Sequence, residues 1–132
     1  MNKYLFFLLV KDMIQGNFLK YHLQATGCKD VVLFQNQSEC FYSIRKNVIP
    51  DFIIADTSLD GMTDKEFLRF IKTGHPEISV IFLSENDDLS HISGLLEDGA
   101  TDYILKDGGK NNWMDELVLN LHYLIKEELD LR

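Results

Sequence analysis

The sequence predicts an α/β fold in which helices cover both faces of a parallel sheet of five strands. Two observations support this prediction: five short apolar runs recur along the chain, and the segments between them carry helix signals. Runs that are almost continuously apolar are typical of parallel strands buried on both faces, and their alternation with helices indicates a doubly wound sheet. The expected strands occupy residues 5–10, 31–34, 52–55, 78–83 and 103–105.

The first two helices are expected between the first three runs. Asp12 and Gln15 have the spacing of a capping box, and Gly27 marks the end of the first helix. Ser38 is the expected cap of a shorter second helix, which ends near Arg45. The apolar stripe expected on the first helix consists of Ile14, Phe18, Leu19 and Leu23.

The other three helices have similar boundary signals. Thr63 and Glu66 form a capping box, and Gly74 ends the third helix. The fourth helix is expected over about residues 87–97, and Asn112 is the expected cap of the fifth. The residues expected to face the core are Phe67, Leu68 and Ile71 in the third helix, Ile92, Leu95 and Leu96 in the fourth, and Met114, Leu117, Val118, Leu121, Leu124 and Ile125 in the fifth.

Length and composition indicate one domain over residues 1–132, because a chain of 132 residues can bury a single core. The chain is 45% hydrophobic and 26% charged, with a net charge of −8. This acidic balance argues against direct binding of nucleic acid or of an anionic membrane, since both favour clustered Lys and Arg. Cys28 and Cys40 fit no disulfide framework or metal-binding pattern, so a reduced, cytoplasmic protein is expected.

The apolar run near the N-terminus has an alternative interpretation as the core of a signal peptide. Lys11 and Asp12 follow the run, however, where a cleavage site of small residues would stand. The run is also much shorter than the roughly 20 residues of a transmembrane helix. It is therefore expected to form a buried strand.

Polar residues follow three of the expected strands directly. Asp56, Ser84 and Lys106 each stand immediately after an apolar run. Because the carboxyl ends of parallel strands meet at one edge of the sheet, these side chains are expected to share the crevice where open α/β sheets bind ligands. The combination suits phosphoryl chemistry, with the carboxylate as nucleophile, the lysine balancing charge on the phosphoryl oxygens, and the hydroxyl donating to one of them.

Three sequence motifs, PDFIIADTSLDGM, IFLSE and GATDYILK, are similar to those of the receiver domains of two-component response regulators. The resemblance extends over nearly the whole chain and implies a flavodoxin-like sheet with strand order 2-1-3-4-5. It implies that Asp56 is the phosphoacceptor and that Lys106 contacts the phosphate. It also implies that Ser84 and Tyr103 are switch residues that respond to the phosphoryl group.

The resemblance also implies a set of partners. A receiver domain takes part in a phosphorelay with a histidine kinase or a phosphotransfer protein and acts on an output protein or domain. It is a signalling module, and its own chemistry is at most self-phosphorylation from a phosphodonor and auto-dephosphorylation. The face made by residues 87–97, 103–105 and 112–125 is expected to meet partners, or a second copy in a homodimer.

The chain departs from the family pattern at three places. The positions where the family usually has two acidic, Mg²⁺-binding residues hold Val10 and Lys11, and Asp12 stands one place further on. Asp60 replaces the proline of the loop after the acceptor position. Asp107 replaces the proline after the fifth-strand lysine, so the usual cis peptide bond is not expected there.

These departures weaken the expected Mg²⁺ site. Mg²⁺ requires oxygen ligands, which leaves Asp12 and the Ser58 carbonyl as weak candidates beside Asp56, with Asp60 as a further loop carboxylate. Lys11 repels a cation and, if its stem allows, is expected to lie near Asp56 in the place of the metal's charge. Metal binding and phosphotransfer are then expected to be weak or absent.

Three functions remain open from the sequence. The chain is either a receiver in which Asp56 accepts a phosphoryl group with little metal dependence, or a pseudo-receiver that docks partners independently of phosphorylation. The remote third option is a small flavodoxin-like enzyme or cofactor binder. Against it, KDMIQGN lacks the hydroxyl- and Gly-rich loop of a flavin site, and the segment Asp56-Thr57-Ser58 lacks the D-x-D of haloacid-dehalogenase phosphatases.

Overall fold

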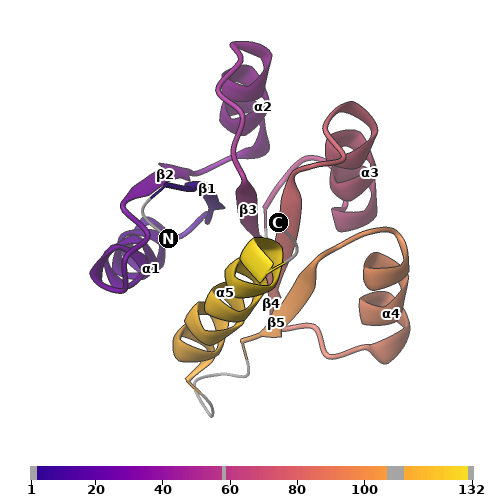
Figure 1. Ribbon diagram of the computed structural model, residues 1–132. Coiled ribbons are helices and arrows are strands. Elements are labelled where there is room, and N and C mark those ends of the chain that lie inside the picture. Colours follow the sequence, from indigo (N-terminus) through magenta and orange to yellow (C-terminus); the bar gives the residue numbers. More distant parts are fainter. Residues whose placement is uncertain (1–2, 58, 107–111, 131–132) are drawn as a thin grey trace.

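The computed structural model describes residues 3–57, 59–106 and 112–130, and for residues 127–130 it describes only the helical backbone. Strands and helices alternate along these residues (Figure 1). The elements are β1 (Leu5–Leu9), α1 (Met13–Ala25), β2 (Asp30–Phe34), α2 (Gln37–Arg45), β3 (Phe52–Asp56), α3 (Asp64–Gly74), β4 (Ser79–Ser84), α4 (Leu89–Glu97), β5 (Asp102–Leu105) and α5 (Trp113–Asp130).

The strands form one parallel sheet in the order β2-β1-β3-β4-β5. This order confirms the predicted flavodoxin-like, doubly wound sheet. Helices α1 and α5 cover one face, and α2, α3 and α4 cover the other (Figure 1). The order makes β3 the central strand, so its last residue, Asp56, lies in the middle of the carboxyl edge.

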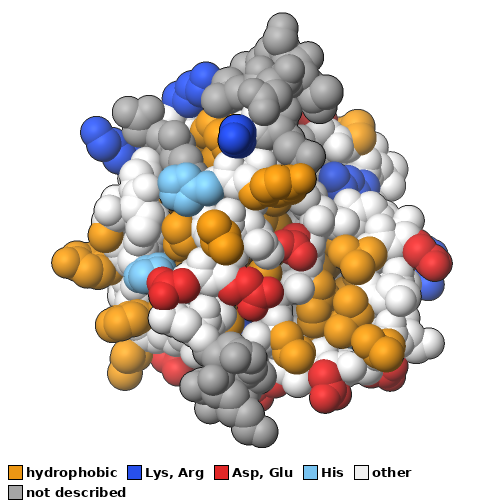
Figure 2. Space-filling model, turned by 60° about the horizontal axis from the view of Figure 1, so that its bottom comes forward, with side chains coloured by type: hydrophobic (Ala, Val, Ile, Leu, Met, Phe, Trp, Pro, Cys, Tyr) orange, Lys and Arg blue, Asp and Glu red, His pale blue; other side chains and the backbone are white. Residues whose placement is uncertain are grey.

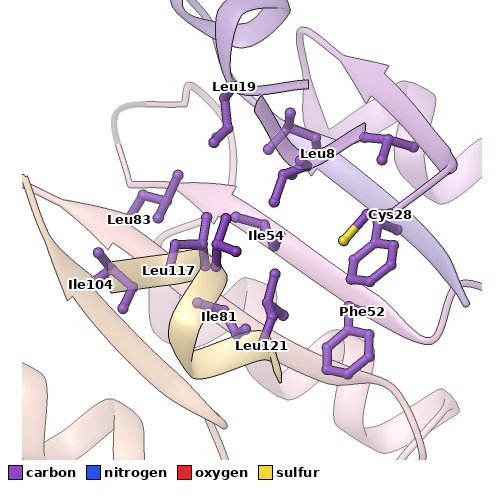
Figure 3. Packing of buried hydrophobic residues seen from close by; sticks show 14 of the residues in the cluster. Leu8, Leu19, Cys28, Phe52, Ile54, Ile81, Leu83, Ile104, Leu117 and Leu121 are labelled. Carbon is purple, nitrogen blue, oxygen red and sulfur yellow. The ribbon is translucent and has the colours of Figure 1, made fainter. Parts of the chain in front are cut away.

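Alternate strand residues point into two separate cores, as the pleat of a strand requires. Leu8 of β1 faces the core under α1 and α5, whereas Phe7 faces the core under α2, α3 and α4. In the first core, Leu117 and Leu121 of α5 lie over Ile54 of the central strand (Figure 3). All five side chains are fully buried, and each such burial stabilises the fold by about 1.5–3 kcal/mol.

Capping side chains fix where several helices begin. Asp12 caps α1 by accepting hydrogen bonds from the backbone N–H groups of Ile14 and Gln15, at 2.9 and 3.3 Å. Thr63 and Glu66 form the predicted capping box of α3. These caps satisfy backbone donors that have no partner within the first turn of a helix.

One prediction about α1 and one about α2 were wrong. Asn36, not Ser38, caps α2, because the Asn36 side chain accepts a hydrogen bond from the Glu39 N–H at 2.9 Å. The buried face of α1 is also rotated from the predicted stripe: Ile14 is 85% exposed. Its buried residues are instead Gly16, Leu19 and Leu23.

Gly16 explains the rotation of α1. A Cβ atom at this position would lie 3.0 Å from a methyl group of Leu33, so the helix backbone approaches β2 where there is no side chain. A prediction based on the spacing of apolar residues overlooks this contact.

Two other residues predicted to face the core, Phe18 and Leu96, are 64% and 44% exposed.

None of the helices in the described part of the chain has the length and apolarity needed to cross a membrane.

Candidate functional site

Asp56 and Lys106 form a buried ion pair at the carboxyl edge of the sheet. The Lys106 Nζ lies 2.7 Å from the Asp56 Oδ2, and the two residues are only 9% and 7% exposed. Asp56 ends β3 and Lys106 follows β5, so the lysine reaches across the end of β4. A charge-assisted hydrogen bond of this length fixes the positions of both groups.

Gln15 and Trp113, which were not predicted from the sequence to lie in the site, also contact Lys106. The Lys106 Nζ donates to the Gln15 Oε1 of α1 at 3.1 Å and lies 5.7 Å from the centre of the Trp113 ring, at the start of α5. Its backbone N–H also donates to the carbonyl of Ser84 at 2.7 Å. Lys106 is therefore fixed by residues from β3, β4, α1 and α5.

Hydroxyl groups line the opposite side of the site. The Thr57 Oγ1 donates to the Ser84 Oγ at 2.7 Å, and the Asn86 N–H donates to the same oxygen at 3.0 Å. Ser84 is 1% exposed. A hydroxyl can accept two hydrogen bonds and donate one, so Ser84 is able to act as a donor as well as an acceptor.

The three predicted residues Asp56, Ser84 and Lys106 line one cavity of about 370 Å³. The prediction that they converge is therefore confirmed. Figure 2 shows the molecule from this end, where acidic side chains lie near the middle of the view and exposed apolar side chains lie around them. The cavity is lined by Asp12, Gln15, Asp56, Thr57, Ser84, Glu85, Asn86 and Lys106.

Tyr103, the predicted aromatic switch residue, contacts the loop beside this cavity. Its hydroxyl donates to the carbonyl of Asn86 at 2.8 Å, and its ring meets His91 edge-on at 6.3 Å between ring centres. Burial is the main cause that raises the pKa of Tyr103. The hydroxyl therefore stays protonated, as its donor role requires.

A second polar pair links the helices next to the site. The His91 Nε2 of α4 lies 3.1 Å from the Asp64 Oδ2, at the start of α3. Burial raises the pKa of Asp64, and the hydrogen bond to His91 opposes that shift. No motif in the sequence indicates this pair, because the two residues are brought together only by the packing of α4 against α3.

Lys11 does not lie near Asp56, although this was predicted from the sequence. Its Nζ lies 3.3 Å from the Asp60 Oδ2, and the two side chains are 60% and 92% exposed. The Asp56 carboxylate is instead paired with Lys106. Val10, at the other acid-pair position, is fully buried in the core under α1 and α5.

Asp12 and Glu85 are the other carboxylates among the described residues that line the Asp56 cavity, and Mg²⁺ usually takes one or two carboxylates together with waters. Within residues 3–57, 59–106 and 112–126, no three or more His, Cys, Asp or Glu side chains are arranged to hold a metal ion. Asp12 lines the cavity, and its Oδ1 accepts hydrogen bonds from two backbone N–H groups of α1. The Ser58 carbonyl and Asp107, with the peptide bond that precedes it, lie outside the described residues.

Five parallel strands in the order β2-β1-β3-β4-β5, alternating with five helices, define a flavodoxin-like fold. The family model described as the response regulator receiver domain matches residues 9–118. The chain therefore belongs to the response regulator receiver family. Receiver domains are generally not enzymes, and they interact with histidine kinases or phosphotransfer proteins and with output domains.

Individual relatives agree with this assignment. The chain is 31% identical over 121 residues to the two-component response regulator ARR5 of Arabidopsis thaliana, covering 79% of this chain and 64% of that protein. It is 30% identical over 73 residues to the DNA-binding transcriptional regulator NtrC of Escherichia coli K12, covering 55% of this chain and 15% of NtrC. The chain thus spans less than two thirds of the length of these relatives.

Solved structures show the same fold. The receiver domain of the Francisella response regulator 1452 superposes with a TM-score of 0.81. The superposition covers 96% of this chain and 99% of that one, at 21% sequence identity. This likeness supports the flavodoxin-like fold of the chain.

Proposed function

We propose that this receiver domain accepts a phosphoryl group on Asp56. The observation that carries the proposal is the buried Asp56–Lys106 pair, 2.7 Å long, in a cavity that Ser84 also lines. A carboxylate is a competent nucleophile toward phosphorus when a fixed cation offsets the charge that accumulates on the phosphoryl oxygens. Lys106 is held in place for that task by its contacts to Gln15 and Trp113.

In the proposed reaction, an Asp56 oxygen attacks the phosphorus of a phosphohistidine or of a small phosphodonor. The new O–P bond forms as the P–N or P–O bond to the leaving group breaks, and the leaving group takes that electron pair. Lys106 stays within reach of the transferred phosphoryl oxygens, and the Ser84 hydroxyl donates a hydrogen bond to one of them. Thr57 and Asn86 orient Ser84 for this role through their hydrogen bonds to its oxygen.

A specific observation favours a second candidate, a pseudo-receiver that docks partners independently of phosphorylation. The positions of the usual acid pair hold a fully buried valine, Val10, and a lysine, Lys11, that pairs with Asp60. The described site then offers one fixed cation, Lys106, to balance the charges of the attacking carboxylate and the phosphoryl group. If the charge of Lys106 alone does not offset these negative charges, phosphoryl transfer to Asp56 is slow or absent.

Partner contacts are proposed for the face of α4, β5 and α5. Several large apolar side chains are exposed on its two helices, as expected of a surface that docks another protein or a second copy. A histidine kinase or a phosphotransfer protein is the proposed phosphodonor, and an output protein or domain the proposed target. The exposed apolar residues are Leu89, Leu96, Leu119 and Tyr123.

Intact mass spectrometry after incubation with acetyl phosphate or phosphoramidate tests the two candidates. The reaction is run with and without Mg²⁺, beside the receiver domain of E. coli NtrC as a positive control for the donor. Gain of one phosphoryl group on this chain, with little dependence on Mg²⁺, supports the Asp56 proposal. No gain, while the NtrC domain is labelled, favours the pseudo-receiver.

A further inference from the structure

A groove of about 600 Å³ lies between α2 and α3, on the face of the sheet opposite α1 and α5 (Figure 1). Its lining residues differ entirely from those of the Asp56 cavity. It also lies outside the face of α4, β5 and α5 proposed above for partner contacts. The residues that line it are Phe41, Ile44, Arg45, Met62, Glu66, Arg69, Phe70, Ile71, Thr73, Gly74 and His75.

The floor of the groove is apolar and partly open to solvent. The rings of Phe41 and Phe70 lie 4.7 Å apart between their centres, and Phe70 remains 53% exposed. The buried residues Ile44 and Ile71 lie below them and continue into the core under α2 and α3. A contiguous apolar surface in a hollow between helices is typical of a site that another molecule covers.

Hydrogen bonds hold α2 to the loop before α3, which fixes one end of the groove. The Gln37 side chain, only 8% exposed, donates to the carbonyl of Met62 at 3.1 Å and accepts from the Met62 N–H at 2.8 Å. Gly61 lies against the same side chain in a left-handed backbone conformation, with φ of 115°. A preformed groove loses less conformational freedom when it binds a partner.

The rim of the groove is basic, although the chain as a whole carries a net charge of −8. Arg45 and Arg69 line it from α2 and α3, and they are two of the three arginines in the sequence. Neither guanidinium forms an ion pair with any carboxylate of the described residues. The lining carboxylate, Glu66, is already hydrogen-bonded to the Thr63 N–H in the capping box of α3.

We propose that the α2–α3 groove docks an acidic amphipathic helix of a partner protein. An aromatic or aliphatic side chain of that helix packs on Phe41 and Phe70, and its Asp or Glu residues pair with Arg45 and Arg69. Helices lie in grooves of this kind through apolar anchors at helical spacing. Charge complementarity favours an acidic partner over a basic one, and the proposal does not depend on phosphorylation of Asp56.

The test uses two synthetic amphipathic peptides with the same apolar face of Leu and Phe, one flanked by Glu and the other by Lys. Each is titrated into the ¹⁵N-labelled full chain, and NMR shifts map the contact while fluorescence anisotropy gives the affinity. The expected result is that the Glu peptide shifts amides of α2 and α3 and binds more tightly than the Lys peptide. Phe70→Ser, a change at a half-exposed position, should weaken that binding.

Charge-reversed variants supply the matched control. Arg45→Glu with Arg69→Glu should weaken the Glu peptide by about tenfold, because two exposed ion pairs are replaced by repulsion. Lys29→Glu with Lys126→Glu changes the net charge equally, at exposed residues outside the groove, and should leave the affinity within about twofold.

Four outcomes would overturn the proposal. The first is equal binding of the Lys peptide, and the second is an equal loss of affinity in the lysine control. The third is a set of shifts on α4, β5 and α5 in place of α2 and α3. The fourth is occupation of the groove by a different molecule. Shifts of the groove amides that depend on protein concentration, without peptide, would show that a second copy binds there. Shifts with laurate but not with the Glu peptide would show a small-molecule site.

Discussion

The Lys106 ammonium and the Asp56 carboxylate are joined at 2.7 Å across the end of β4, and each residue is at least nine-tenths removed from solvent. Burying two charges costs desolvation energy that their attraction only partly offsets, so a pair of this kind is a poor source of net stability. Its position at the carboxyl edge of the sheet instead suits charge-dependent chemistry. Removing one partner of the pair should lower the free energy of unfolding, because the other charge stays buried.

Lys106→Met should lower the free energy of unfolding by about 3 kcal/mol at neutral pH, because it leaves the Asp56 carboxylate buried without its cation. Adding Asp56→Asn to that variant should restore most of the loss, since a neutral amide is easier to bury. Urea unfolding followed by circular dichroism measures both effects. Lys126→Met, at an exposed lysine, is the control. A double variant no more stable than Lys106→Met would show that the pair is not the source of the loss.

Val10→Asp should cost about 3 kcal/mol of stability, because the new carboxylate would enter an apolar core without a partner. Val10 is fully buried beside Leu19 and Leu33 in the core under α1 and α5. Lys11→Asp should change stability by less than about 1 kcal/mol, since the exposed pair with Asp60 that it removes contributes little. Thermal unfolding with and without Mg²⁺ measures both. Stabilisation of Val10→Asp by Mg²⁺ would mean that position 10 faces the cavity after all.

Gly61→Ala should destabilise the fold by about 1–3 kcal/mol. Gly61 has a φ of 115°, and a Cβ atom there would lie 2.6 Å from the Gln37 Oε1. Gly94→Ala is the matched control, because this helical glycine of α4 has no atom within 4 Å of an added Cβ and should gain about 0.5–1 kcal/mol. The midpoints of denaturant unfolding measure the stability of both variants. Equal changes in stability for Gly61→Ala and Gly94→Ala would show that the contact with Gln37 does not matter.

Tyr103→Phe should lower stability by about 1 kcal/mol at neutral pH through loss of the hydrogen bond to Asn86. Burial raises the pKa of Tyr103 above its ordinary value, so the folded state holds this proton more tightly than the unfolded chain. That contribution is complete below about pH 10 and is lost as the pH rises through the folded-state pKa. The difference between wild type and variant should therefore shrink in alkali. A difference in stability that does not change with pH, or an equal difference for Tyr21→Phe, would contradict the role of the Tyr103 hydrogen bond.

Much of the fold could be predicted because its signals are local. The five apolar runs and the Thr63–Glu66 capping box lie within a few residues of the elements they specify, and the strands fall within about one residue of the runs. The buried face of α1 was predicted wrongly because it depends on Gly16 meeting Leu33 of another element. A pattern of apolar side chains cannot identify a buried glycine, because glycine has no side chain.

The candidate site could be predicted in part for the same reason. Asp56, Ser84 and Lys106 stand at strand ends, and strand order brings strand ends together. Gln15 and Asn86 could not be placed, because their positions depend on how α1 and the loop after β4 leave the sheet. Lys11 was placed wrongly because a long, exposed side chain takes its direction from its surroundings, here the carboxylate of Asp60.

Labelling of substituted chains with a small phosphodonor tests the identity of the acceptor most directly. Wild type, Asp56→Asn and Asp12→Asn are incubated with phosphoramidate and analysed by intact mass before and after acid treatment. Asp12→Asn is a suitable control because asparagine also caps helices well, so α1 should keep its start. We expect an acid-labile phosphoryl group on wild type and on Asp12→Asn, and none on Asp56→Asn. Labelling that persists in Asp56→Asn, or that is absent from the wild type, would contradict the assignment of Asp56 as the phosphoacceptor.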